Sequence, residues 1–276
     1  MKKLLRDYLP WLYASLRAIY GMTPLAILKR NRQKKERLIS LEFRKKRNAE
    51  IMADVFNGDY RVANGPFMGM KYIESSAGSA LLPKILGSYE EPIHGWVETA
   101  IAKGYDKILD IGCAEGYYAA GFAMRLPATK IFAYDSNPAA LELCRELAAL
   151  NGLGNVETKQ ICDFQELDDQ ISGHTLVFCD IEGAERELLD PARATKLKFT
   201  DLMIESHDSF MPGTTNMLIE RFGDTHKISV AVDYPGRLKT YKTPNDAPSG
   251  VMDEIINENR AKLMRFLYCE SFTVAE

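Results

Sequence analysis

The chain contains the segment Lys107-Ile-Leu-Asp-Ile-Gly-Cys-Ala-Glu-Gly116, in which an apolar run leads into an acidic turn with two glycines. The apolar residues suit a strand that is buried on both faces of a parallel sheet. Gly112 and Gly116 let the backbone turn tightly and approach a ligand closely. Residues 115–125 predict a helix whose first backbone N–H groups are free to face that turn. This order of strand, turn and helix is typical of a nucleoside-binding site at the edge of a parallel sheet.

The spacing within the turn separates two classes of cofactor. A dinucleotide fingerprint would read G-x-G-x-x-G, whereas this turn reads Asp110-x-Gly112-x-Ala114-x-Gly116. A carboxylate two residues ahead of the first glycine disfavours a pyrophosphate and favours a cationic ligand. S-adenosylmethionine carries an ammonium and a sulfonium, so the turn predicts this cofactor. The alternative is an ordinary strand-to-helix turn without a ligand.

A second carboxylate stands at the spacing expected for ribose binding. Lys130-Ile-Phe-Ala-Tyr-Asp135 is a short apolar strand pattern that ends in an acid, about twenty residues beyond the glycine turn. An ionised carboxylate accepts hydrogen bonds only, so it matches a vicinal diol and would repel a 2′-phosphate. The alternative is that Asp135 caps the helix that begins at Pro138, a role that Ser136 or Asn137 could also fill.

Strand and helix patterns alternate along the rest of the chain, which predicts an α/β fold with a doubly wound, mostly parallel sheet. The expected strands are 107–111, 130–135, 156–161, 175–180, 201–205, 227–234 and 264–270. The expected helices are 92–103, 115–125, 138–150, 184–189, 216–222 and 251–263. Seven strands fit a sheet whose ligand crevice lies beyond the carboxyl ends of the strands. Asp163, just after the third strand, is then placed either to meet the adenine amino group or to be a surface acid.

These residues carry a family resemblance. The turn Asp110–Gly116, Asp135, the segment Cys179-Asp-Ile-Glu-Gly-Ala-Glu185 and the segment Ile204-Glu-Ser-His207 together resemble class I S-adenosylmethionine-dependent methyltransferases, and more narrowly the FkbM-like family. The likeness covers about residues 85 to 210. It implies a Rossmann-like seven-stranded sheet with an antiparallel last strand, and O-methylation, often of sugar hydroxyls in glycans or glycosylated metabolites. Asp135 departs from the family, which more often shows Glu-Pro at this place.

The turn and the resemblance together give the expected cofactor contacts. They are Asp110, Gly112, Cys113, Ala114, Glu115, Gly116, Tyr117, Asp135, Ser136, Asp163 and Asp180. By the same resemblance, Tyr89 and Glu90 are expected to contact cofactor or acceptor, the alternative being a packing tyrosine and an exposed acid.

Methyl transfer by in-line displacement needs positioning and a group that takes a proton from the acceptor. Asp180 and Glu182 follow the fourth predicted strand and His207 follows the fifth, so all three can line one crevice. His207 is the expected general base, because its unperturbed pKa lies near neutrality. Asp180 would orient the acceptor hydroxyl or accept its proton. For Glu182 and Glu185 the alternative role is to stabilise a helix N-terminus by their charge.

The same region also permits a metal-assisted mechanism. Asp180, Glu205, His207 and Asp208 offer oxygen and imidazole ligands that could hold magnesium or manganese and lower the pKa of a bound diol. We expect metal-free base catalysis and keep the metal as the alternative.

Charge divides the chain unevenly. Residues 1–50 hold fourteen lysines and arginines against four acids, so the remainder of the 276 residues is acidic. We therefore expect a basic amphipathic helical arm at 1–56, a hairpin and lid at 57–91 around Asn64-Gly65, and a catalytic domain at 92–276. The five cysteines include no C-x-x-C pair and predict buried thiols in a reducing cytosol.

The arm leaves the partners open. It contains aromatic and basic residues and no apolar run long enough to span a membrane, which suits peripheral docking on an anionic inner membrane surface near a lipid-linked sugar or glycan acceptor. Packing on its own domain or on a second subunit, as in a homo-oligomer, is the alternative. Two other functions are possible for such a chain. One is methylation of RNA or protein that docks on the arm, and the other is a non-catalytic scaffold that binds the cofactor. The acidic catalytic domain argues against nucleic acid.

Overall fold

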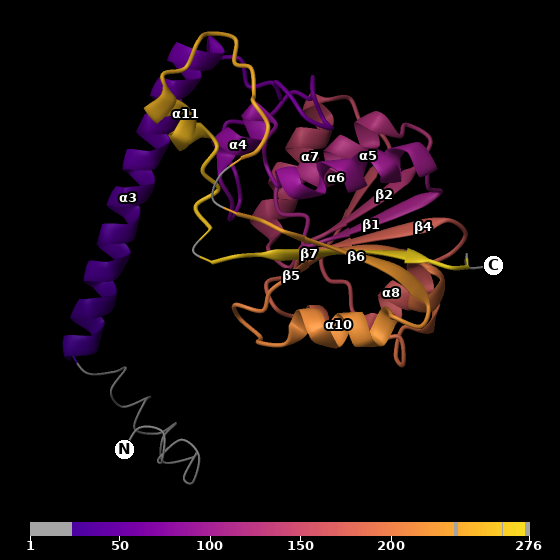
Figure 1. Ribbon diagram of the computed structural model, residues 1–276. Helices are drawn as coiled ribbons and strands as arrows, with labels where there is room; N and C mark the ends of the chain where they lie inside the picture. Colours follow the sequence, from indigo (N-terminus) through magenta and orange to yellow (C-terminus); the bar gives the residue numbers. More distant parts are fainter. Residues whose placement is uncertain (1–23, 235–236, 261, 274–276) are drawn as a thin grey trace. The chain divides into compact units, whose positions relative to one another are not determined.

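The computed structural model describes residues 24–234, 237–260 and 262–273 (Figure 1). The part of the expected arm that covers residues 1–23 lies outside them. The chain divides into two units, one that ends at Ile51 and one that comprises Met52–Glu276. Helix α3 (Pro24–Phe56) runs through the described part of the first unit and ends in the second. No described helix combines the length and the apolar character that crossing a membrane requires.

A seven-stranded sheet forms the centre of the second unit. Its strands are β1 (Lys107–Ile111), β2 (Lys130–Tyr134), β3 (Val156–Lys159), β4 (Thr175–Cys179), β5 (Asp201–Ser206), β6 (His226–Val232) and β7 (Arg265–Ser271). Their order is β3-β2-β1-β4-β5-β7-β6. Strand β7 runs antiparallel to both of its neighbours, and the other pairs are parallel. The predicted α/β fold with a mostly parallel, Rossmann-like sheet is confirmed.

Helices cover both faces of this sheet. In Figure 1, α5 (His94–Lys103), α6 (Tyr117–Arg125) and α7 (Pro138–Leu150) lie on one face, and α8 (Phe164–Gln170) and α10 (Thr214–Phe222) lie on the other. The shorter helical elements are α4 (Leu81–Leu86), η1 (Glu91–Ile93), α9 (Glu185–Leu188), η2 (Thr195–Phe199) and α11 (Ser249–Ile255). The sequence patterns missed α4, α8 and η2, which are short and show little periodicity.

Local chemistry fixes several helix ends. Asn137 caps α7, because its side-chain oxygen accepts from the backbone N–H of Ala139 at 3.1 Å and Pro138 occupies the first turn. Helix α11 ends at Ile255 and not at residue 263 as predicted. The side chain of Asn257 accepts from the backbone N–H of Asn259 at 2.7 Å, and Asn259 has a left-handed φ of 57°. This Asx turn stops the helix.

The expected hairpin at Asn64-Gly65 is wrong in its details. Its described flanks form no regular strands: an isolated antiparallel bridge joins Arg61 and Lys71, and backbone hydrogen bonds link residues 60–62 to residues 69–72 around a loop longer than two residues. Pro66 follows directly, and a Cβ at Gly65 would collide with the carbonyl oxygen of Gly87. The Asn64 amide donates to the carbonyl oxygens of Leu86 and Lys242, at 2.8 and 2.9 Å. Packing against distant backbone therefore replaces the two-residue hairpin turn.

Apolar packing makes the strand ends rigid. One cluster joins Leu109, Val177 and Leu202 from β1, β4 and β5 to Leu218 and Phe222 of α10, and none of these side chains is exposed. Burying each such side chain contributes roughly 1.5–3 kcal/mol. The five cysteines are buried free thiols, as predicted. The side chains that follow the strands are thus held on a fixed frame.

Candidate active site

A cleft of about 800 Å³ lies beyond the carboxyl ends of the parallel strands. Each central strand delivers a polar residue to it: Asp110 from β1, Asp135 after β2, Asp180 after β4, and Glu205 and His207 at the end of β5. Residues 77–79, Lys84 and Tyr89, which precede the sheet in sequence, form another part of the wall. The cleft therefore occupies the place where doubly wound sheets bind their ligands.

The glycine turn is locked against the sheet. The backbone N–H groups of Gly112 and Cys113 both donate to the carbonyl oxygen of Tyr134, at 2.8 and 2.9 Å. Gly112 has a φ of 90°, and a Cβ there would collide with the carbonyl oxygen of Asp180. Only glycine fits this position, because both the backbone conformation and the space exclude a side chain.

Two carboxylates of the turn region suit a cationic nucleoside ligand. Asp110 is 2% exposed, and its Oδ2 has no hydrogen-bond partner among the described residues. Burial raises the pKa of Asp110 to about 7, so a cation beside it would favour its ionised form. Asp135 accepts from the backbone N–H of Ala114 at 3.0 Å and from that of Asn137 at 2.7 Å. Since Asn137 caps α7, Asp135 is left to face the cleft. The orphaned acceptor, the Gly112 cradle and the cleft volume fit S-adenosylmethionine.

The structure brings most of the predicted cofactor residues to the cleft. Those that line it are Asp110, Gly112, Cys113, Ala114, Tyr117, Asp135, Ser136 and Asp180. Tyr89 also lines the cleft, and Glu90 is buried, so it is not the exposed acid of the alternative.

Three predicted contacts lie elsewhere. Gly116 packs on Cys144, where an added Cβ would come within 2.6 Å of the sulfur. Asp163 caps α8, because it accepts from the backbone N–H groups of Gln165 and Glu166 at 3.0 and 2.9 Å. Glu115 is fully buried beneath the turn. These residues support the site from outside the cleft.

Glu115 forms a buried ion pair that the sequence did not indicate. Its carboxylate accepts from Lys84 Nζ at 2.5 Å, from the hydroxyls of Tyr72 and Ser76 at 2.7 Å each, and from the backbone N–H of Ala77 at 2.9 Å. Burial would raise the pKa of Glu115, but the charge of Lys84 and these hydrogen bonds hold the pKa below its ordinary value. The pair ties the segment before the sheet to the cofactor turn.

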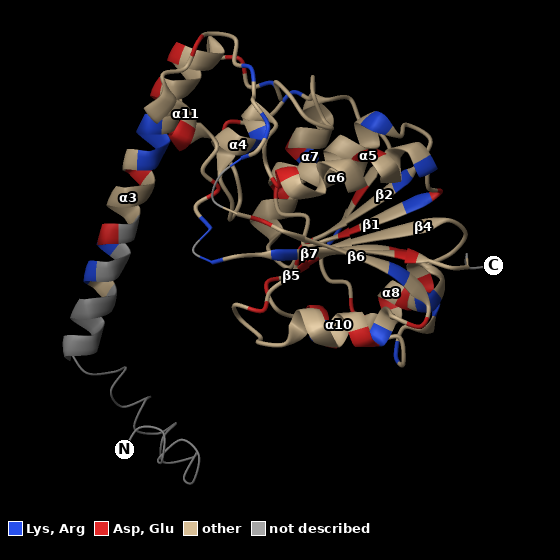
Figure 2. Ribbon diagram, viewed as in Figure 1, with Lys and Arg blue, Asp and Glu red and all other residues tan. Residues whose placement is uncertain are grey.

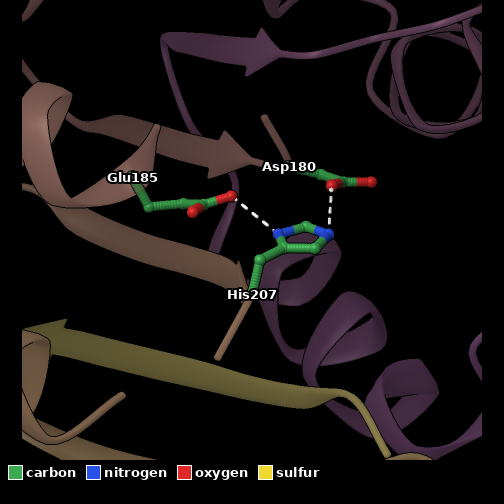
Figure 3. A group of neighbouring side chains, drawn as sticks. All are labelled: Asp180, Glu185 and His207. Atoms are coloured by element: carbon green, nitrogen blue, oxygen red, sulfur yellow. Dashed lines mark hydrogen bonds and ion pairs between the residues drawn. The ribbon is translucent and has the colours of Figure 1, made fainter. Parts of the chain in front are cut away.

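His207 is the centre of the acid–base group (Figure 3). Its Nδ1 lies 2.7 Å from Glu185 Oε1, and both side chains are almost fully buried. Its Nε2 lies 3.4 Å from Glu182, 3.5 Å from Asp180 and 3.8 Å from Glu205. Burial lowers the pKa of His207, but the hydrogen bond to Glu185 and the charges of Glu205, Glu185 and Glu182 outweigh burial and raise the pKa above 6.5.

The role of Glu185 was predicted only as helix N-terminal charge. Its Oε1 also accepts from the backbone N–H groups of Ile181 and Gly183, at 3.2 and 3.1 Å. The carboxylate thus orients the imidazole and is itself oriented by the backbone, as the third member of a nucleophile–base–orienter arrangement would be. The sequence signal for it was the segment Asp180-Ile-Glu-Gly-Ala-Glu185, which carries part of the family resemblance.

A half-buried arginine that lines the cleft balances several of the carboxylates. Arg260 forms ion pairs with Glu90 at 2.7 Å, with Asp233 at 2.8 Å, with Glu258 at 2.9 Å and with Glu205. Burial and Glu90 nevertheless raise the pKa of Glu205 to about 8, and burial, Glu205 and Glu90 raise that of Asp180. Sequence reasoning missed Arg260 because it lies 55 residues from Glu205 and follows no motif.

The metal-ligand set of the sequence is only partly brought together. Ligand atoms of Asp180, Glu185 and His207 lie within 4.8 Å of one another, and so do those of Glu90, Asp180 and Glu205. Asp208 belongs to neither group. It instead accepts from the backbone N–H of Gly213 at 2.9 Å and from Thr215 at the start of α10. Each group therefore contains only two of the four predicted ligands, Asp180 with His207 in one and Asp180 with Glu205 in the other.

Comparison with known proteins agrees with this fold. Residues 102–204 match a family model described as a methyltransferase domain. No curated protein sequence matches the chain.

Solved structures of three methyltransferases resemble parts of it. The first is the O-methyltransferase TomG of Streptomyces achromogenes, in complex with S-adenosylmethionine (15% identity, 63% of this chain and 77% of that chain, TM-score 0.43). The second is a precorrin-6y C5,15-methyltransferase of Geobacter metallireducens (15% identity, 63% of this chain and 86% of that chain, TM-score 0.42). The third is an S-adenosylmethionine-dependent O-methyltransferase of Thermotoga maritima (12% identity, 66% of this chain and 66% of that chain, TM-score 0.42). Likenesses this distant carry no argument about the acceptor.

The buried Glu115–Lys84 pair predicts a large cost when one partner loses its charge. We expect Glu115→Gln to lower the free energy of unfolding by about 3 kcal/mol, because Lys84 is then buried without a counter-charge. Urea denaturation at neutral pH measures this, and Glu142→Gln is the matched control, since Glu142 and Arg145 form an exposed pair. The control should change stability by less than about 0.5 kcal/mol. Equal effects of the two substitutions would contradict the prediction.

Proposed function

We propose that this chain, a class I S-adenosylmethionine-dependent methyltransferase, methylates a hydroxyl group of a sugar or glycan-type acceptor, with His207 as general base. S-adenosylmethionine, when bound, supplies a methyl group on a positively charged sulfur that is already a good leaving group. The remaining tasks belong to the protein. The observation that supports the proposal most is the buried pair of His207 and Glu185, with Nε2 next to Asp180 and Glu182, which line the cleft.

The pair is suited to remove a proton from an alcohol. The hydrogen bond between Nδ1 and Glu185 fixes which ring nitrogen carries the proton, so neutral His207 presents an unprotonated Nε2. When Nε2 takes the acceptor proton, the imidazolium that forms lies within 3.8 Å of the oxygens of Asp180, Glu182 and Glu205. Burial and neighbouring acids raise the pKa values of Asp180 and Glu205, but a positive imidazolium favours their ionised forms. Together with Glu182, these groups therefore stabilise the imidazolium by charge once it forms.

The acceptor class is inferred from the same oxygens. Asp180 Oδ1 is buried without a hydrogen-bond partner among the described residues, and Glu182 is 73% exposed at the cleft mouth. A carboxyl group accepts hydrogen bonds when ionised and also donates one when protonated, and a sugar offers several hydroxyl groups close together that can do both. A polyol therefore matches this wall better than an acceptor that lacks hydrogen-bond donors.

Labelling tests the activity and the acceptor together. We expect purified protein and methyl-labelled S-adenosylmethionine to label the glycan or glycolipid fraction of an extract of the source organism. His207→Gln should lose at least about a hundredfold of this activity, as expected for removal of a general base. The variant should still bind S-adenosylhomocysteine. His174→Gln, which alters a histidine outside the cleft, is the control and should label normally.

Other labelling outcomes would contradict parts of the proposal. Label in RNA or protein would refute the sugar acceptor, and full activity of His207→Gln would refute the base. Excess EDTA should leave the activity intact, whereas its loss and recovery with magnesium or manganese would favour the metal-assisted alternative.

The pKa of His207 gives a test that needs no acceptor. In a proton NMR titration we expect His207 to titrate above pH 6.5, while His94 and His226, whose pKa values are lowered by burial, titrate below it. Glu185→Gln removes the partner charge and should shift the pKa of His207 downward. Glu187→Gln, on the exposed side of the same helix, should leave it unchanged. If Glu185→Gln leaves the pKa of His207 unchanged, the proposed pairing is ruled out.

We further propose that the basic arm docks on an anionic membrane surface. Within its described part, Leu38, Ile39 and Phe43 are exposed, and basic residues lie on both sides of them along α3 (Figure 2). Each basic residue near such a surface contributes on the order of 1 kcal/mol. Acceptors that are anchored in a membrane would then be concentrated near the enzyme.

Vesicle flotation tests the docking. The protein should float with vesicles that contain phosphatidylserine, remain behind with vesicles of phosphatidylcholine alone, and be released at high salt because screening weakens the attraction. If it stays in the soluble fraction with anionic vesicles at low salt, the arm has another role.

A further inference from the structure

We infer that Lys84 and the Tyr117 hydroxyl bind the carboxylate of the cofactor's amino-acid end and so make the enzyme selective for that end. The inference rests on S-adenosylmethionine being the methyl donor. It assigns a binding role to Lys84, which lies in the short helix α4, well before the cofactor turn in sequence.

Lys84 places a positive charge in the cleft wall. Its side chain is 3% exposed, and it lines the cleft with Ser79 and Tyr89. The ammonium donates to Glu115 at 2.5 Å and to Ser79 Oγ at 2.7 Å, and it lies 4.8 Å from the centre of the Tyr89 ring. An ammonium has three N–H donors, so these two bonds leave one for a ligand.

Tyr117 supplies a second hydrogen-bond donor at the cleft. Its side chain is 3% exposed and lines the same cleft, and its hydroxyl has no hydrogen-bond partner among the described residues. Its ring centre lies 5.6 Å from Lys84 Nζ. A buried polar group without a partner costs free energy, which a bound ligand can recover. Burial also raises the pKa of Tyr117, so the hydroxyl remains a donor.

The neighbouring acid restricts the ligand that these donors accept. Asp110 lines the same cleft with its own unpartnered oxygen, close enough to Lys84 for the lysine to lower its pKa. A phosphate would meet the charge of Asp110, and a simple cation would meet the charge of Lys84. An α-amino acid group carries one charge of each sign, so its carboxylate suits Lys84 and Tyr117 while its ammonium suits Asp110.

Calorimetry with two nucleosides tests the assignment without turnover. S-adenosylhomocysteine has the amino-acid end, and 5′-methylthioadenosine lacks it. We expect wild-type protein to bind S-adenosylhomocysteine at least about tenfold more tightly than it binds 5′-methylthioadenosine. Tyr117→Phe should lower the affinity for S-adenosylhomocysteine by about tenfold, because a hydrogen bond to a charged group is lost. It should leave the affinity for 5′-methylthioadenosine unchanged.

The role of Lys84 needs a variant that folds. Lys84→Met combined with Glu115→Gln removes both charges of the buried pair, an exchange that proteins usually tolerate better than the loss of one partner. This double variant should also bind S-adenosylhomocysteine at least about tenfold more weakly than wild type, and its affinity for 5′-methylthioadenosine should not change. Lys103→Met with Asp201→Asn removes an ion pair outside the cleft and is the matched control, which should bind both nucleosides as wild type does.

Three results would overturn the inference. An unchanged affinity of both variants for S-adenosylhomocysteine would show that Lys84 and Tyr117 do not contact its carboxylate. Equal losses for both nucleosides would show that the pair only supports the cleft. If wild-type protein bound neither nucleoside, the cofactor assignment itself would fail, and this inference with it.

Discussion

The close passage of the Gly112 backbone beneath the carbonyl oxygen of Asp180 is the contact on which the site depends. It occurs because β1 and β4 are neighbours, and the backbone N–H of Asp180 continues their pairing by donating to Ile111 at 2.9 Å. On the other side, Tyr134 at the end of β2 holds the same turn through its carbonyl oxygen. Three strand ends are thus joined into one rigid edge, which brings the cofactor turn and the acid–base residues into a single cleft. A side chain at Gly112 would separate them.

Several carboxylates lie close together in this cleft, and the positive side chains that balance their charge determine how the rest of the site is arranged. Asp110, Asp180, Glu205 and Glu90 would repel one another strongly in a buried region if nothing balanced them. The cations that do so come from distant parts of the chain: Lys84 from α4 and Arg260 from the segment after α11. His207, just after β5, adds a positive charge when it takes a proton. Ion pairs therefore hold the segments around residues 84–90 and 258–260 against the sheet edge. The same charges suit a ligand that carries an ammonium and a carboxylate, and a base that becomes positive when it takes a proton.

Individual residues show how far sequence reasoning reached. Asp110, Asp135, Asp180 and His207 could be placed together because each lies near or just after the end of a strand pattern, and the carboxyl ends of parallel strands share one edge. Glu115 and Asp163 were expected at the cofactor for the same reason, yet their side chains turn to a buried lysine and to a helix N-terminus. Asp208 was expected among possible metal ligands and instead holds the start of α10. Position along the chain fixed where these residues emerge, but not which neighbour each carboxylate meets.

The amino-acid sequence alone therefore determined the seven-stranded doubly wound fold, the cofactor turn and the residues at the strand ends, because periodicity and turn chemistry are local properties that a single segment carries. Tertiary structure decided the pairings: Glu185 with His207, Lys84 with Glu115, and Arg260 with its four carboxylates. Charges find partners through space and not along the chain, and the burial that makes a pairing strong exists only once the sheet and its covering segments have come together.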